Sequence, residues 1–183
     1  MLAPIDVTNI RIETERLMIR PWLESDLADF YEYASVDGVG QMAGWKPHES
    51  MEESKTILGY FINDKRNLAL ELKENGKVIG SIGLEVMYPD PIEGESYGRE
   101  LGYVLSKDYW GRGLMPEAVK AVIDYCFDVL HYDYLTCSHF LRNDRSRRVI
   151  EKTGFTYFGE SGFDTQLGHT EISKNYILYN PNR

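Results

Sequence analysis

Cysteine is scarce in this sequence, and long apolar runs are absent. Cys126 and Cys137 are the only cysteines among the 183 residues. They form neither a CxxC motif nor a disulfide framework, so we expect two buried free thiols. No apolar run approaches the length of a membrane span. The first ten residues have neither the basic start nor the apolar stretch of a signal peptide. These absences predict a cytoplasmic protein without a membrane partner.

Positive charge is also in short supply. Lys and Arg number 20 against 29 Asp and Glu, which gives a formal net charge of −9. Proteins that bind nucleic acid present a basic surface to its phosphates, so this charge argues against a nucleic-acid partner. It leaves room for a cationic or amine substrate, although solubility explains the same charge. His131, His139 and His169 lack metal-ligand spacing, and we assign no metal.

The composition is that of an ordinary globular chain, with 43% hydrophobic and 27% charged residues. The length predicts a single domain over residues 1–183. Strand-like and helix-like periodicities alternate along it. We expect strands over residues 10–22, 68–72, 78–88, 100–105, 134–140, 155–163 and 172–179. We expect helices over residues 25–34, 51–65 and 114–130, and a short basic helix that Asn143 caps and Gly154 ends.

Local signals place other ends of these elements. Ser25 is the expected N-cap of the first helix, and Ser50 with Glu53 forms a capping box at the second. The pair Asn75-Gly76 between two alternating runs predicts a hairpin turn. Residues 89–96 are expected to form an acidic loop.

The segment from residue 100 to residue 140 contains a strand, a long helix and a second strand. Such a βαβ unit places its two strands in parallel, with a right-handed crossover. The fold class is therefore α+β, with a mostly antiparallel sheet and one parallel pair near its middle.

Two glycines mark the point where the first strand of this unit gives way to its helix. No side chain at Gly111 or Gly113 blocks approach to the main chain, and the N–H groups that follow are unpaired donors of a helix N-terminus. This combination suits an anion such as phosphate. It is neither a P-loop nor a dinucleotide fingerprint, because the Lys-Ser/Thr pair and the third glycine are missing. The alternative is an ordinary turn with Trp110 anchored in the core.

Three segments in order carry a family resemblance. They are ETERLMIRPW (Glu13–Trp22), ELGYVLSKDYWGRGLMPEA (Glu100–Ala118) and NDRSRRVIEKTGF (Asn143–Phe155). Together they resemble the GNAT superfamily of acyl-CoA-dependent N-acetyltransferases. The most similar subgroup is the Rim-like one, which includes enzymes that acetylate the N-termini of ribosomal proteins. The resemblance covers nearly the whole chain. It implies a central twisted, mostly antiparallel sheet with one splayed parallel strand pair and helices on both faces.

The resemblance also implies acetyl-CoA as co-substrate. The family places its pyrophosphate on a (Q/R)-x-x-G-x-(G/A) loop, which residues 110–115 match with Gly113 at the fixed glycine. Trp110 and Met115 depart from the first and last positions. The pantetheine arm is expected to pair with backbone exposed between the splayed strands. The implied cofactor-binding residues are Leu101, Tyr103, Val104, Leu105, Trp110, Gly111, Arg112, Gly113, Leu114, Met115, Asn143 and Ser146.

The implied reaction moves an acetyl group to a primary amine by direct attack in a ternary complex. Attack requires a neutral amine, so a base is needed, and Glu100 is the best carboxylate candidate. The alternative is a strand-edge glutamate paired with Arg99 or a lysine. Ser146 matches the family's N-x-x-S serine, proposed to protonate the leaving thiolate; otherwise it is a helix-surface hydroxyl. Val149 and Ile150 stand where many relatives have a tyrosine acid.

Other residues have weaker assignments. Asn143 either contacts the pantetheine arm or only caps its helix. Trp45, an aromatic expected to be exposed, and His48 lie in a loop that contributes to the acceptor pocket in relatives, so Trp45 and Glu100 are the expected substrate-binding residues. A basic cluster either meets the adenosine phosphates of CoA through one or two members or forms a solvated helix face; it comprises Arg142, Arg145, Arg147, Arg148 and Lys152.

Several functional alternatives stay open. The acceptor is either a protein N-terminus or a small amine such as a polyamine, an amino sugar or an aminoglycoside. A non-catalytic acyl-CoA-binding or regulatory module on the same fold is the rival function, and a homodimer is as compatible with the sequence as a monomer.

Overall fold

The computed structural model describes residues 1–87 and 96–183. The end of the expected strand 78–88 and most of the expected acidic loop 89–96 lie outside the described residues. Within them, one sheet contains β1 (Ile12–Glu13), β2 (Leu17–Pro21), β3 (Asn67–Leu72), β4 (Val78–Glu85), β5 (Gly98–Leu105), β6 (Tyr134–Phe140), β7 (Thr156–Asp164) and β8 (Thr170–Tyr179). The helices are α1 (Leu27–Ala34), α2 (Met51–Asp64), α3 (Leu114–Asp128) and α4 (Asp144–Lys152), with short 3₁₀ turns η1 (Glu24–Asp26), η2 (Gly40–Ala43) and η3 (Lys107–Tyr109).

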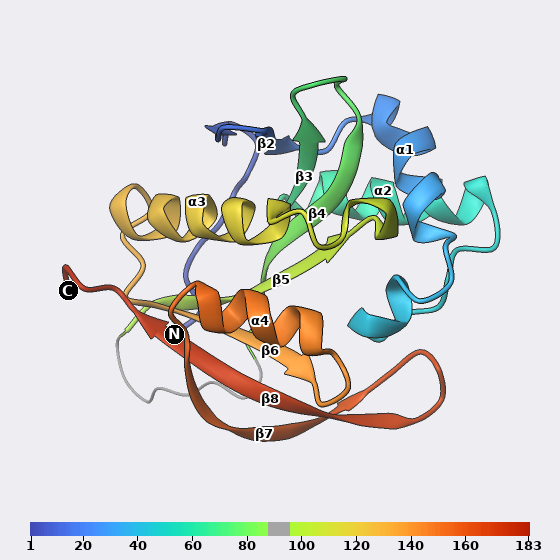
Figure 1. Ribbon diagram of the computed structural model, residues 1–183. Helices are drawn as coiled ribbons and strands as arrows, with labels where there is room; N and C mark the ends of the chain where they lie inside the picture. The colour runs from blue at the N-terminus through green and yellow to red at the C-terminus, as the bar shows by residue number, and fades with distance from the viewer. Residues whose placement is uncertain (88–95) are drawn as a thin grey trace.

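The strand order is β1-β2-β3-β4-β5-β6-β8-β7, and neighbouring strands are antiparallel except β5 and β6. The parallel pairing has three residue pairs and ends where Glu100 meets Thr136. Beyond that point the two strands diverge, although β5 continues to Leu105 and β6 to Phe140 (Figure 1). The predicted α+β fold with one splayed parallel pair is confirmed.

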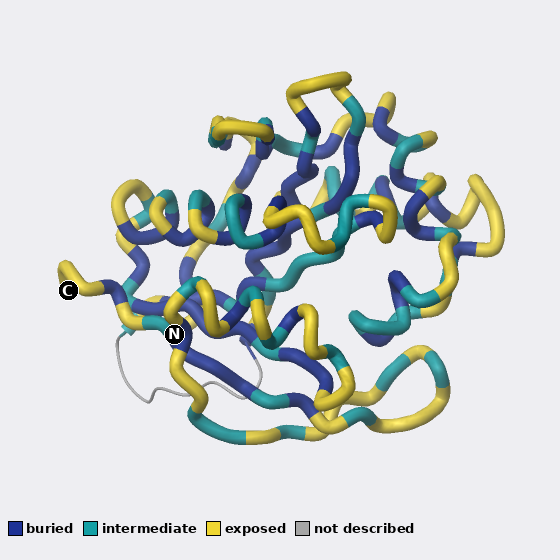
Figure 2. Tube along the Cα trace, in the orientation of Figure 1, coloured by how far each residue is buried: buried dark blue, intermediate teal, exposed yellow. Residues whose placement is uncertain are grey.

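Helices cover both faces of the sheet and bury a core on each (Figures 1 and 2). Helix α3 packs its apolar face, including Val119 and Val122, against the strands in the larger core. The smaller core lies on the opposite face, where Trp22 and Phe30 pack with residues of α2. Side chains alternate between faces along a strand, so the sequence of each central strand contributes to both cores.

Most predicted helix ends are confirmed. The Ser50 hydroxyl accepts a hydrogen bond from the Glu53 N–H at 3.2 Å, and the Asn143 side chain caps α4 in the same way. Gly154 follows α4 with a φ of +91°, a left-handed conformation that glycine adopts at little cost. The two cysteines are buried free thiols.

Two predictions near the N-terminus were wrong. The expected strand 10–22 is divided into β1 and β2 by a tight turn, which the Thr14 hydroxyl stabilises by accepting the Leu17 N–H at 3.0 Å. The predicted cap at Ser25 lies inside η1, and α1 begins at Leu27. The Asp26 carboxylate holds this turn, because it accepts the N–H of Leu23 and binds both terminal nitrogens of the Arg20 guanidinium.

Candidate functional site

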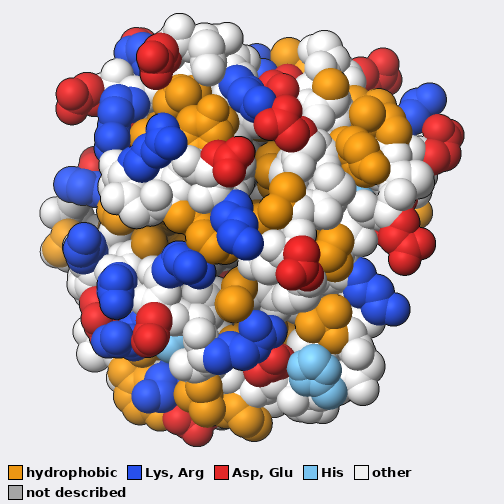
Figure 3. All heavy atoms as spheres, turned by 45° about the vertical axis from the view of Figure 1, so that its right-hand side comes forward, with side chains coloured by type: hydrophobic (Ala, Val, Ile, Leu, Met, Phe, Trp, Pro, Cys, Tyr) orange, Lys and Arg blue, Asp and Glu red, His pale blue; other side chains and the backbone are white. Residues whose placement is uncertain are grey.

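A cavity of about 640 Å³ lies where β5 and β6 separate. Its walls are the unpaired part of β5, the glycine loop before α3, the end of β6 and one face of α4, and η2 contributes Met42 and Ala43. Figure 3 shows Lys and Arg side chains gathered among apolar atoms on one face of the molecule. Eleven of the twelve expected cofactor-binding residues line this cavity, and only Arg112 does not.

The glycine loop presents bare backbone to this cavity. Gly111 and Gly113 both have a φ of +75°, and a Cβ atom placed on Gly111 would meet nothing within 4 Å. Gly113 is the N-cap of α3, and Pro116 in the first turn has no N–H to satisfy. In the described part of the chain, no acceptor is bonded to the N–H groups of residues 111–115. These donors, at the positive end of a 15-residue helix, fit a phosphate group.

The N-terminal hairpin supports the loop from behind. Arg16 donates from Nη1 to the carbonyl oxygen of Arg112 at 2.8 Å and from Nε to Glu117 of α3 at 2.8 Å. The Thr14 hydroxyl and the Arg16 N–H also donate to the Glu117 carboxylate. Burial alone would raise the pKa of Glu117, but these hydrogen bonds hold it below its ordinary value. Thr14 and Arg16 belong to the ETER segment that contributes to the family resemblance, but the resemblance implies no role for these two residues.

The basic cluster divides into two groups. Arg142 pairs with Glu171, and Arg147 pairs with Asp144 and Glu151, so these two arginines belong to exposed ion pairs. The others, Arg145, Arg148 and Lys152, line the cavity. Within the described residues, none of these three forms an ion pair with a carboxylate. One helix face is therefore solvated and another presents cations to the cavity.

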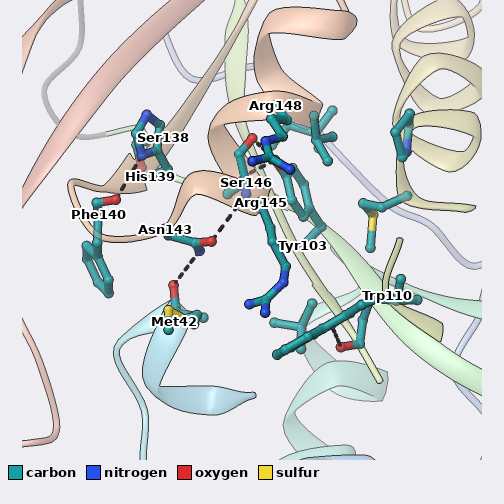
Figure 4. A pocket seen from close by; sticks show the side chains of 18 of the residues that line it. Met42, Tyr103, Trp110, Ser138, His139, Phe140, Asn143, Arg145, Ser146 and Arg148 are labelled. Atoms are coloured by element: carbon teal, nitrogen blue, oxygen red, sulfur yellow. Dashed lines mark hydrogen bonds between the residues drawn. The ribbon is translucent and has the colours of Figure 1, made fainter. Parts of the chain in front are cut away.

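The side chain of Arg145 extends toward the ring of Trp110, and both residues line the cavity (Figure 4). The guanidinium lies 3.9 Å from the centroid of the indole ring, a close cation–π contact. A hydrogen bond fixes the orientation of the indole ring, because its Nε1 donates to the Leu105 carbonyl oxygen at 2.9 Å. Trp110 is half-buried: it packs against the smaller core, as the alternative of a core anchor expects, and it also lines the cavity.

Glu100 lies at the end of the cavity where strand pairing stops. The Ser138 hydroxyl of β6 donates to Glu100 Oε1 at 2.7 Å, and Glu85 of β4 is its cross-strand neighbour. The alternative partner, Arg99, has a buried guanidinium that donates to the carbonyl oxygens of Ala3 and Leu84. Glu100, Glu85 and Ser138 all line the cavity.

Ser146 is buried in the first turn of α4, so the prediction of a surface hydroxyl is wrong. Its Oγ lies 2.9 Å from the hydroxyl of Tyr103 on β5, and its N–H donates to Asn143 Oδ1 at 3.2 Å. Asn143 also donates to the Met42 carbonyl oxygen at 3.3 Å, which ties α4 to η2 (Figure 4). Burial, and then the neighbouring Cys137 thiol, raise the pKa of Tyr103 well above its ordinary value.

Glu100 and Ser146 approach the gap from opposite faces of the sheet. Leu101 and Tyr103 pack against the core that contains α3, so Glu100, one residue before Leu101, points to the other face. Its hydrogen bond to Ser138 agrees with this, because Thr136 is its register partner and Ser138 shares the face of Thr136. A molecule that passes through the gap would meet a carboxylate on one side and a serine hydroxyl on the other.

The expected substrate contact of Trp45 is not supported. Trp45 is half-buried, not exposed; its ring covers Gly40 and lies 5.3 Å from the ring of His48. His48 is buried and bonds to the Ser54 hydroxyl at 2.7 Å, and burial lowers its pKa. Neither residue lines the cavity. Two phenylalanines that the sequence analysis did not propose as site residues, Phe140 and Phe163, do line the cavity.

The described residues contain neither a membrane-spanning helix nor a metal-ligand cluster. No helix among them is both long enough and apolar enough to cross a bilayer. No three His, Cys, Asp or Glu side chains in the same part of the chain are grouped as metal ligands would be. The cytoplasmic location and the lack of a metal stay predictions.

Comparison with known proteins adds independent information. The sequence matches the family described as acetyltransferase (GNAT) domain over residues 16–156. It is 26% identical over 150 residues to the uncharacterized N-acetyltransferase YoaA of Bacillus subtilis, covering 79% of this chain and 81% of that protein. The ribosomal-protein-S5-alanine acetyltransferase of Vibrio fischeri has a TM-score of 0.71 at 22% identity, covering 95% of this chain and 98% of that one. The spermidine N-acetyltransferase of Vibrio cholerae, solved with CoA and spermine, has a TM-score of 0.73 at 19% identity, covering 91% and 97%.

Proposed function

The chain belongs to the acetyltransferase (GNAT) domain family, and we propose that the cavity between β5 and β6 is where it transfers an acetyl group from acetyl-CoA to a primary amine. The observation that carries the proposal is the juxtaposition of bare loop N–H groups with an interrupted parallel strand pair. The first suits a pyrophosphate, and the second leaves strand backbone free to pair with an amide-containing arm.

The residues present fit CoA in charge and in shape. The N–H groups of residues 111–115 would hold the pyrophosphate, and the free edge of β5 over residues 101–105 would pair with the pantetheine arm. Arg145, Arg148 and Lys152 would meet the remaining phosphate charge. Asn143, whose amide already caps α4, would border the arm. Bound acetyl-CoA supplies an acetyl group activated as a thioester.

The chain's own residues would handle the protons. Glu100 would accept a proton from the attacking amine, directly or through water, and the Ser138 hydroxyl would hold its carboxylate in place. Ser146, on the opposite face, would donate a proton toward the sulfur. This arrangement suits direct attack in a ternary complex, because base and acid reach the gap from different sides and leave the middle for the reacting atoms.

The acceptor side of the cavity favours a cationic amine. Glu85 and Glu100 are register partners on adjacent strands, and both line the cavity. The Arg66 guanidinium lies 3.1 Å from the Glu85 carboxylate and offsets part of its charge. The two carboxylates together still carry an excess of negative charge that attracts an ammonium group, and the net charge of −9 adds a long-range field of the same sign. Among the similar structures, one protein is named for spermidine and was solved with spermine, and the other is named for the alanine of a ribosomal protein. Polyamines and protein N-termini are therefore the acceptors to test first.

The decisive experiment measures thiol release from acetyl-CoA with a panel of amines. The panel should contain spermidine, spermine, a peptide with an N-terminal alanine, an amino sugar and an aminoglycoside. We expect at least one amine to raise thiol release well above the hydrolysis background. Calorimetry with acetyl-CoA alone distinguishes the rival function: binding without thiol release for any amine would support a non-catalytic module. If acetyl-CoA does not bind, both the acetyltransferase and the non-catalytic acyl-CoA-binding module are excluded.

A further inference from the structure

Tyr103 forms a hydrogen bond with Ser146, the residue proposed to protonate the sulfur. Tyr103 comes from β5 and Ser146 from the first turn of α4, 43 residues later in the chain. The two hydroxyl oxygens lie 2.9 Å apart, and both residues line the cavity. Figure 4 shows the two side chains next to each other. The pair therefore bridges the free edge of β5 and the helix that carries the proposed acid.

The direction of this hydrogen bond decides what Ser146 is able to do. The Tyr103 hydroxyl has one proton and three neighbours that could accept it: Ser146 Oγ at 2.9 Å, the Ser146 carbonyl oxygen at 3.2 Å and the Cys137 thiol. A thiol sulfur is a weak acceptor, so it competes poorly with an oxygen. That carbonyl lies inside α4, where the helix ladder already supplies it with a donor. When the Tyr103 hydroxyl donates to Ser146 Oγ, the proton of the serine hydroxyl is free to point into the cavity. The reverse direction would turn that proton back toward Tyr103.

An aliphatic hydroxyl on its own is a poor proton donor to sulfur. Accepting a hydrogen bond polarises a hydroxyl and strengthens its own donation, since chains of hydrogen bonds are cooperative. The accepted hydrogen bond also stabilises the negative charge that develops on the serine oxygen as the serine proton leaves. Val149 and Ile150 occupy the helix positions where many family members have a tyrosine acid. Here a tyrosine hydroxyl reaches the same neighbourhood from the strand.

We propose that Tyr103 is a positioning residue that acts through Ser146: its hydroxyl donates to Ser146 Oγ and directs the serine proton toward the sulfur of the bound thioester. This inference rests on the proposed function of the cavity. In the reaction the amine nitrogen bonds to the acetyl carbonyl carbon, and the carbon–sulfur bond breaks with its electron pair going to sulfur. The amine attacks in its neutral form, after an ammonium substrate has given one proton to water. The nitrogen then loses one proton to Glu100, and the sulfur gains one from Ser146. Water restores the proton of Ser146 and removes that of Glu100, so the protons balance.

The first test compares two buried tyrosines. Tyr103→Phe removes the hydroxyl that contacts Ser146. Tyr132→Phe is the matched control, because Tyr132 is buried and its hydroxyl donates to the Pro4 carbonyl oxygen, away from the cavity. We expect Tyr103→Phe to lower kcat about 10- to 100-fold, below the full range of a general acid, with the KM for acetyl-CoA changed less than about twofold. Tyr132→Phe should leave both constants near wild type. An unchanged kcat for Tyr103→Phe would overturn the proposal.

A double mutant separates positioning from general damage. If Tyr103 acts through Ser146, then Tyr103→Phe should have less than about a twofold further effect on kcat in the Ser146→Ala background. A structural disturbance would lower kcat by the same factor in both backgrounds, and that outcome would contradict the inference. The melting temperature of each variant shows whether the chain still folds.

A second measurement needs no amine. CoA is bound at a fixed pH of about 8, and its thiolate fraction is read from the thiolate absorbance. The charged residues that line the cavity are the same in all variants; they are Glu85, Glu100, Arg145, Arg148 and Lys152. We expect a smaller thiolate fraction in Tyr103→Phe and Ser146→Ala than in wild type, because the hydrogen-bond donor is lost. Equal fractions would refute the pair's role. If wild type binds acetyl-CoA but no amine yields thiol, the proposed function fails, while this measurement still decides whether Tyr103 and Ser146 act on the sulfur.

Discussion

The guanidinium of Arg145 lies 3.9 Å from the centroid of the Trp110 ring, so α4 brings a cation to the start of the glycine loop. Trp110 stands at the first position of the (Q/R)-x-x-G-x-(G/A) pattern, where the family has Gln or Arg. The indole is held by its bond to Leu105 and supports the guanidinium beside the glycine loop. A residue from another part of the chain thus supplies charge next to the first position of the motif, which here is apolar.

Replacing Arg145 tests this arrangement. We expect Arg145→Ala to weaken acetyl-CoA binding by about 1–2 kcal/mol, because a charge-assisted contact to phosphate is lost, with kcat little changed. Calorimetry with acetyl-CoA measures the effect. Arg147→Ala is the control on the same helix, since Arg147 is engaged with Asp144 and Glu151 outside the cavity. Equal affinity of the two variants would contradict a role for Arg145.

The glycine loop makes a second prediction. Gly113→Glu should reduce acetyl-CoA affinity about 100-fold or more, on the order of 3 kcal/mol, because it places a carboxylate where a pyrophosphate belongs. Gly76→Glu is a matched control: its φ of +73° carries similar backbone strain, its Cβ would meet nothing within 4 Å, and it lies in the β3–β4 hairpin. Binding that survives Gly113→Glu while the fold is intact would remove residues 111–115 as the phosphate site.

The carboxylate pair on the acceptor side gives a third prediction. Glu100→Gln should lower kcat about 10²-fold or more, because the amine loses its base. Glu85→Gln should instead raise the KM for a cationic acceptor with a smaller effect on kcat, because it removes attraction and not proton transfer. Steady-state kinetics with the best amine of the panel separate the two effects. A similar loss of kcat in both variants would argue against Glu100 as the base.

Glu117 makes a prediction about stability and pH. Its pKa is lower in the folded chain than the ordinary value of about 4.3, so it stabilises the fold above that value and the stabilisation is lost as the pH falls through the folded pKa. We expect Glu117→Gln to lower the free energy of unfolding by about 1–2 kcal/mol at pH 7 and by much less at pH 3. Urea unfolding at both pH values measures this. Glu74→Gln, in an exposed turn, should change neither; an equal loss for Glu117→Gln at both pH values would show that the carboxylate charge is irrelevant.

Sequence reasoning succeeded where local rules decide structure. The strand-like pattern of residues 134–140 predicted β6 at its observed bounds. The caps at Ser50 and Asn143 were predicted correctly because each depends on a side-chain hydrogen bond within one helical turn. The glycine loop was found for the same reason, since a left-handed backbone conformation selects glycine locally.

What it missed depends on contacts between distant segments. Arg16 reaches a carbonyl 96 residues away, and Tyr103 meets a helix 43 residues later. The local sequence does not show which distant group a turn residue such as Arg16 or a strand residue such as Tyr103 will contact. Trp45 shows the converse error: flanking loop residues suggested exposure, but packing over Gly40 and His48 buries much of the ring.

Because β5 and β6 are joined by three residue pairs, the rest of the β5 edge that faces β6 has backbone N–H and C=O groups without a strand partner. An ordinary sheet has unpaired strand edges only at its rim, where they invite aggregation with other chains. In this protein, residues 101–105 form an edge in the middle of the molecule, walled by α4 and the end of β6. The backbone groups that other folds must shield from neighbouring chains here face a cavity, where they are available to a ligand instead of to another chain.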